Sequence, residues 1–205
     1  WTTTAPSIKD VGTKTVHIRA NKNGYEAATA TATMTVNAAP LHVTANAGQT
    51  KAYYADPVEL KYDYTEGDLK NGEVPGFDGK LACTGNTKTS AVGDYDITCG
   101  MLALKDKDAF KAGNYSLTFT GNKFSVTKSN ALQLTADGKT VTYDGTSHSG
   151  VVTTSGVGEG VTITLTYKYD ENGIEKNSTT QPSITDVGTQ TVQVTAAATG
   201  YKSVI

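Results

Sequence analysis

Residues 182–201 read PSITDVGTQTVQVTAAATGY, and residues 6–25 read PSIKDVGTKTVHIRANKNGY. Without gaps, the two stretches share Pro-Ser-Ile, the run Asp-Val-Gly-Thr, a Thr-Val pair, an alanine and the closing Gly-Tyr. Unrelated loops would not agree at so many turn and core positions. The chain therefore contains an internal repeat, and a repeat has to be recognised before the rest of the organisation is interpreted.

The composition around the repeat is typical of β-sheet protein. The 205 residues are 37% hydrophobic, rich in Thr, Val and Tyr, and include 21 Gly. β-Branched and aromatic residues suit a pleated surface, and glycine suits turns. Segments such as 28–36 and 161–169 alternate, Asn172-Gly173 indicates a hairpin, and the best helical candidate is one short turn at 66–72. We predict an all-β fold of tandem small β-sandwich (Ig-like) modules, with that short turn in the central one.

The positions of the repeat predict three domains. Residues 1–38 would be the C-terminal part of an Ig-like repeat, and residues 129–205 would be an Ig-like repeat that lacks its last strand. Residues 39–128 have a different sequence and the length of a small β domain. The linkers between the three are a few residues long, which predicts a semi-rigid string of modules.

The middle segment carries an ordered set of short motifs, and by them it resembles the MBG domain of bacterial surface proteins, the type with a Tyr-Gly motif. Tyr54 stands where that motif has glycine, so the resemblance does not determine the turn there. The motif residues are Lys51, Tyr53, Asp56, Pro57, Gly67, Asp68, Val92, Gly93, Tyr95, Asn114 and Tyr115.

The flanking segments resemble Ig-like repeats that accompany such domains in Gram-positive adhesins. The likeness rests on Asp186-Val187-Gly188, on its N-terminal counterpart at residues 10–12, and on Tyr143-Asp144-Gly145. Glycine in the Val-Gly pair suits a tight turn at the start of a strand. The resemblance implies structural roles for these motifs, and it implies no catalytic residue and no cofactor.

Cys83 and Cys99 are the two cysteines of the chain. If segments 79–85 and 94–100 are antiparallel neighbours, alternation points both thiols to the same buried face as Leu81 and Ile97. We predict a disulfide between them, which agrees with an exported protein. Two separate buried thiols are the alternative.

Charge and residue spacing argue against several kinds of chemistry. A net charge of -2 without a basic face argues against nucleic-acid partners, and no stretch approaches the roughly 20 apolar residues of a membrane span. Asp144, Ser147 and His148 contain the letters of a hydrolase triad, but they fall in one turn, whereas a triad converges from separate elements. We expect no enzyme activity, no metal and no cofactor.

Together these features predict a non-catalytic stalk or spacer of a large bacterial cell-surface adhesin. It would be extracellular, at the surface of a Gram-positive cell or secreted, and would hold a binding head away from the wall. The alternative is that this segment itself binds a host ligand (mucin glycan, matrix protein or immunoglobulin) through a sheet face or edge. An exposed aromatic patch of roughly several hundred Å² would favour the alternative.

The two flanking segments complement each other. A complete repeat would begin like residues 131–145 and end like residues 23–36; segment 1–38 has the end alone, and segment 129–205 stops before that strand. A two-stranded remnant is marginal on its own, and a missing strand exposes a sheet edge. We expect neighbouring repeats of the same protein as partners, and either head-to-tail self-association or a poorly ordered N-terminal segment.

Overall fold

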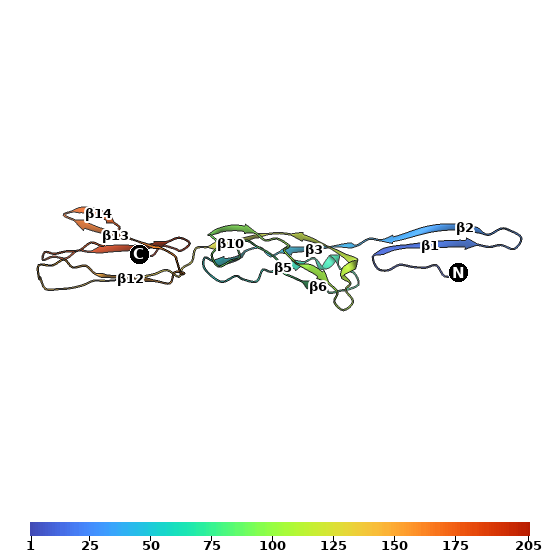
Figure 1. Cartoon of the computed structure of the whole chain (residues 1–205), viewed down its shortest axis with the longest axis horizontal. Coiled ribbons are helices and arrows are strands. Elements are labelled where there is room, and N and C mark those ends of the chain that lie inside the picture. Colours follow the sequence, from blue (N-terminus) through green and yellow to red (C-terminus); the bar gives the residue numbers. More distant parts are fainter. The chain divides into compact units, whose positions relative to one another are not determined.

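A computed structural model describes all residues, 1–205, and the fold is all-β as predicted. Fifteen strands are joined by turns and by two short 3₁₀ turns, η1 (Glu66–Asp68) and η2 (Ala112–Asn114) (Figure 1). The first of these lies inside the segment in which a short helical turn was expected. No helix in the structure has the length and hydropathy needed to cross a bilayer.

The chain forms two compact units, and each takes part of the central segment 39–128. Unit 1 comprises residues 1–49, 59–83 and 96–123, and unit 2 comprises residues 50–58, 84–95 and 124–205. The domain boundaries predicted from the repeat stay a prediction. The two units are described separately below.

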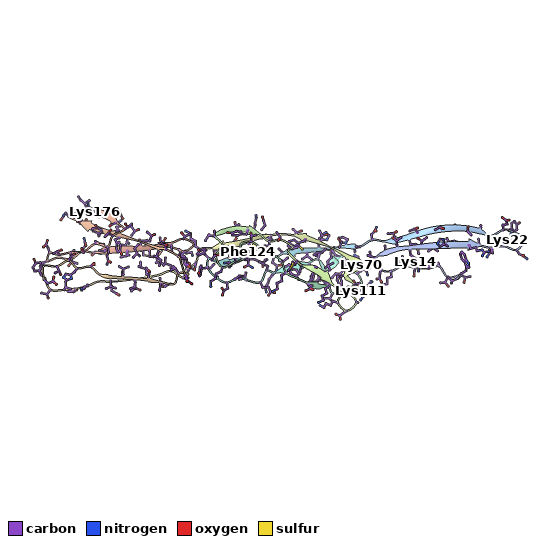
Figure 2. The ribbon with its side chains drawn as sticks, in the orientation of Figure 1. Lys14, Lys22, Lys70, Lys111, Phe124 and Lys176 are labelled. Carbon is purple, nitrogen blue, oxygen red and sulfur yellow. The ribbon has the colours of Figure 1, made fainter.

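Unit 1 begins with a long two-stranded hairpin of β1 (Gly12–Ala20) and β2 (Ala28–Val36). The strands are antiparallel, with Val16 opposite Ala32 and Ile18 opposite Ala30. One face of the hairpin carries these apolar side chains and the other carries threonines, but almost every residue is exposed. In Figure 2, side chains project from both faces along the length between Lys14 and Lys22. The hairpin therefore has no core of its own.

The remainder of unit 1 is built on a three-stranded sheet in the order β5–β3–β9. Strand β3 pairs with β5 in antiparallel and with β9 in parallel fashion, the parallel register placing Leu41 opposite Leu117. Leu41, Phe110 and Tyr115 form the buried core, in which the two rings stack at 4.9 Å. The elements are β3 (Ala39–Ala45), β5 (Tyr62–Tyr64) and β9 (Tyr115–Thr120), with a separate pair of β6 (Gly76–Asp78) and β8 (Ala103–Lys105).

Unit 2 contains a three-stranded sheet, a further three-stranded sheet and a strand pair. The orders are β4–β10–β7, β14–β13–β15 and β11–β12. The predicted hairpin is confirmed, because Asn172 and Gly173 join β13 to β14 with φ of 55° and 77°, as a type I′ turn requires. The strands are β4 (Gln49–Ala52), β7 (Gly93–Asp96), β10 (Lys123–Thr127), β11 (Gln133–Asp137), β12 (Val151–Ser155), β13 (Ile163–Glu171), β14 (Ile174–Ser178) and β15 (Val192–Ala198).

The internal repeat is visible in the backbone as well as in the sequence. Gly24 and Gly200 both have φ of 81°. In each copy the tyrosine amide that follows donates a hydrogen bond of 3.1 Å to the carbonyl three residues earlier. The side chains differ, however: Tyr25 is 71% exposed and Tyr201 is 3% exposed. The same local turn is therefore solvated in the first copy and packed in the second.

Candidate functional site

The central motif Lys51–Tyr54 runs from the end of β4 into a tightly held turn at Tyr53 and Tyr54. Tyr54 has φ of 63°, so it keeps the left-handed conformation that glycine adopts readily and other residues avoid. The Lys51 ammonium donates to the carbonyls of Ala55 at 3.1 Å and Ala52 at 3.4 Å. Burial lowers the pKa of Lys51, and the nearby Asp56 carboxylate opposes that effect. These contacts fix the turn, although Tyr54 stands where the motif has glycine.

The two tyrosines of this turn pack onto the last repeat within unit 2. The Tyr53 ring meets the Tyr201 ring edge-on at 5.4 Å and covers Gly200, where an added Cβ would lie 2.3 Å from it. The Tyr54 ring covers Gly158, where an added Cβ would lie 2.2 Å from it. We call these five residues the tyrosine cluster. Aromatic pairs of this kind contribute about 0.5–1.5 kcal/mol beyond their buried area.

Backbone hydrogen bonds fix the connecting segment beside the tyrosine cluster. The Tyr53 amide donates to the Thr127 carbonyl at 2.7 Å, and the Ser129 amide donates to the Gly200 carbonyl at 2.9 Å. The Ser129 carbonyl in turn accepts from the Lys202 amide at 2.9 Å. The Tyr201 hydroxyl accepts a bond of 2.8 Å from the Gly158 amide. The linker at residues 127–130 is thus bonded to the segments on both of its sides.

A second contact of this kind lies within unit 1, at Asn114. This residue ends η2, immediately before β9. Its Oδ1 accepts a 2.8 Å hydrogen bond from the Val11 amide, and its Nδ2 donates at 2.9 Å to the Asp10 carboxylate. We call this the asparagine contact. One side-chain amide thereby satisfies a donor and an acceptor of the first Asp-Val-Gly-Thr motif.

The second copy of that motif is placed differently. Asp186 and Val187 make no comparable hydrogen bond, and the Val187 side chain is 88% exposed. Gly12 begins β1 in the first copy, whereas β15 begins at Val192, four residues after Gly188. The motif therefore reaches strand structure earlier in the copy that makes the asparagine contact.

The other predicted motif residues of unit 2 lie in the segment after β4 and in or beside β7. Asp56 is exposed and forms a 3.7 Å ion pair with Lys88, whose ammonium also lies 5.2 Å from the centre of the Tyr54 ring. Tyr95 is half-buried and its hydroxyl donates to the Ala91 carbonyl at 2.8 Å. Pro57 and Val92 are exposed, and Gly93 begins β7.

The predicted disulfide is not formed, since Cys83 and Cys99 are both free. Their segments are antiparallel neighbours as expected, but Ala82 is the residue that pairs with Thr98. This register places Cys83 opposite Ile97, so the two cysteines are diagonal neighbours. Diagonal positions lie about 7–8 Å apart, beyond the roughly 4.4–6.8 Å between Cα atoms that a disulfide spans. Alternation along a strand determines the face of a residue, but it does not determine the pairing register.

Asp144, Ser147 and His148, which are the residue types of a hydrolase triad, do not form the hydrogen-bonded chain of a triad. His148 Nε2 lies 2.9 Å from Asp144 Oδ1, but the Ser147 hydroxyl donates to Ser183 at 2.7 Å and makes no bond to His148. Hydrogen bonds from Thr146, and then from His148, hold the pKa of Asp144 well below its usual range. The nucleophile–base bond that activates a serine is therefore missing here.

A cleft of about 510 Å³ lies in unit 2 beside this cluster. Its walls combine apolar side chains, including Val152 and Val194, with polar ones such as His148. Tyr143 lines the cleft and is 62% exposed. The volume is in the range of about 300–1,000 Å³ that small-molecule sites have. No group of three or more metal-ligating side chains comes together anywhere in the chain.

These features define an all-β chain whose distinctive side chains hold consecutive segments together. Residues 41–125 match the family model of the MBG domain (YGX type). The match confirms the resemblance of the central segment that the sequence motifs indicated. No curated protein and no solved structure matches the chain.

Proposed function

We propose that this chain is a non-catalytic spacer of a bacterial cell-surface adhesin, extracellular and of Gram-positive type, that holds a binding head away from the cell wall. The observation that carries the proposal is the position of the tyrosine cluster and the asparagine contact. Both use motif residues of the central segment, Tyr53 and Asn114, to hold residues of the flanking repeats. A string of domains that transmits force needs residues that hold successive modules together.

The tyrosine cluster supports this role through its chemistry. Ser129 is buried beside these rings, and its backbone hydrogen bonds to Gly200 and Lys202 are consequently hard to replace by solvent. A linker held on both sides bends little and offers few extended residues to a protease. A Tyr53→Ala variant should therefore be cleaved faster within residues 127–130, which limited proteolysis with mass spectrometry measures.

The alternative function is that the chain itself binds a host ligand such as a mucin glycan, a matrix protein or an immunoglobulin. The cleft beside Tyr143 favours it, because exposed aromatic rings stack on sugars and the polar lining offers hydrogen-bonding groups. A glycan array and pull-downs with matrix proteins and immunoglobulin separate the two functions. The spacer should give no binding at micromolar concentration. Binding that is lost in Tyr143→Ala would establish the alternative instead.

Self-association is a separate proposal about the partners. The apolar face of the β1–β2 hairpin is exposed, and β15 is an edge strand of its sheet whose outer side is paired at one bridge, between Ala196 and Val204. The rest of that edge can accept another strand, so we propose head-to-tail contacts between chains, which would give open assemblies. Sedimentation velocity over a range of concentrations tests this, and a monomer at every concentration would refute it.

A further inference from the structure

Each flanking repeat carries two potential docking elements for the MBG-type segment. One is the Asp-Val-Gly-Thr loop, at residues 10–13 and 186–189, and the other is the Gly-Tyr turn, at residues 24–25 and 200–201. In the first repeat the loop is occupied and the turn is free. In the second repeat the turn is occupied and the loop is free.

The two Gly-Tyr turns have the same local structure. Whether a tyrosine ring packs on the turn therefore depends on the neighbouring segment and not on the turn itself. Gly24 and Gly200 have the same φ, and the same hydrogen bond closes each turn. A Cβ added at Gly200 would strike the Tyr53 ring, whereas one added at Gly24 would meet nothing within 4 Å. The first turn thus has the shape that accepts a tyrosine ring and has no ring on it.

The two loops differ in the complementary way. In the first loop, the Val11 amide and the Asp10 carboxylate are both bonded by Asn114. In the second loop, the equivalent amide of Val187 and carboxylate of Asp186 make no such bond. A primary amide is suited to bind both groups, because its oxygen accepts while its nitrogen donates.

We propose that the loop Asp186–Gly188 is a docking site for a further module of the MBG type, which would insert the asparagine that precedes its β9-like strand. The free turn at Gly24 would, by the same rule, accept the tyrosine turn of a preceding module. Each repeat then contacts the module before it through Gly-Tyr and the module after it through Asp-Val-Gly-Thr. Because the contact with the preceding module differs from the contact with the following module, modules can be added in one direction only. This proposal deepens the spacer function and rests on it.

A contact this small binds weakly between separate molecules, and tethering supplies the effective concentration that makes it form. The test therefore uses residues 1–203 followed directly by residues 28–128, so that Ala28 takes the place of Val204, because Ser203 is the position equivalent to Ala27. This gives the second repeat its second strand and places another MBG-type module at the natural spacing. Amide hydrogen exchange at Val187, measured by NMR, should slow about tenfold relative to the chain of 205 residues, as expected for one hydrogen bond to an amide group.

Two matched variants assign the protection to the asparagine. Asn114→Ala in the appended module should restore fast exchange at Val187 and leave Val11 protected. Asn114→Ala in the original module should do the reverse. Fast exchange at Val187 in the extended chain, with the appended module folded by its dispersed amide spectrum, would overturn the proposal. That result would leave the spacer function intact. The spacer function is refuted by ligand binding and not by the rate of amide exchange at Val187.

Discussion

Replacing Gly158 by alanine tests whether the Tyr54 ring is held against the last repeat. Gly158 has no positive φ, so its backbone conformation suits alanine. At such positions Gly→Ala stabilises a protein by about 0.4–1 kcal/mol, because the unfolded chain loses freedom. Here an added Cβ would lie 2.2 Å from two atoms of the Tyr54 ring and 2.4 Å from a third.

The ring cannot withdraw at low cost. The Tyr54 backbone is fixed at φ 63°, Lys51 holds its turn, and the Tyr54 hydroxyl donates to the Glu159 carbonyl at 3.4 Å. Overpacking of this kind costs about 1–3 kcal/mol. After subtraction of the unfolded-state gain, we expect a net loss of about 1–2 kcal/mol. For a chain of this size that corresponds to a Tm lower by roughly 2–8 °C.

Urea denaturation measures this loss against two controls. Gly138→Ala is the matched control, because Gly138 has no positive φ and no atom within 4 Å of the added Cβ; it should be neutral or stabilising. The double variant Tyr54→Gly with Gly158→Ala removes the obstructing ring, so alanine should no longer be unfavourable there. Equal midpoints for Gly158→Ala and Gly138→Ala, or purely additive effects in the double variant, would refute the packing argument.

Three further predictions concern other parts of the chain. Both cysteines of unreduced, denatured protein should react with iodoacetamide, because the register keeps them apart; a chain without free thiol would show that the register is wrong. Gly173→Ala should destabilise the β13–β14 hairpin by about 1–2 kcal/mol, the cost of left-handed φ for a residue with a Cβ, and faster amide exchange in β14 would report it. Because its pKa is lowered, Asp144 contributes stability above the usual carboxyl pKa, and this is lost as the pH falls through its folded pKa. Thr146→Ala should move that pKa upward, which NMR titration of the Asp144 side-chain carboxyl carbon checks; an unchanged titration would contradict the assignment.

Local patterns predicted local structure well. Asn172-Gly173 forms the expected turn, and residues 66–68 form the expected short helical turn. Alternation correctly assigned the inward residues of the two cysteine segments, with Leu81 and Ile97 buried. These features depend on φ preference and side-chain period, which residue type determines over a few positions.

Features that depend on distant segments were not predicted. The parallel pairing of β3 with β9 joins residues that are far apart in sequence, and a loop-rich chain gives no signal for it. The disulfide prediction was wrong for the same reason, because pairing register is set by the whole sheet. Tyr54 left its turn undetermined, since the cost of left-handed φ is offset by Lys51 and by the ring's contacts with Gly158.

The glycines explain why motifs revealed the turns but not what those turns contact. Gly24 and Gly200 occupy the same place in the repeat and have the same φ, so the sequence around them predicts the same backbone. Only Gly200 is also required for the space that the Tyr53 ring fills. Gly158 lies at no turn that needs its φ, and the Tyr54 ring accounts for it. A glycine that the backbone does not require is therefore a sequence signal for close approach by another segment, and at Gly158 that segment is the turn that carries Tyr54.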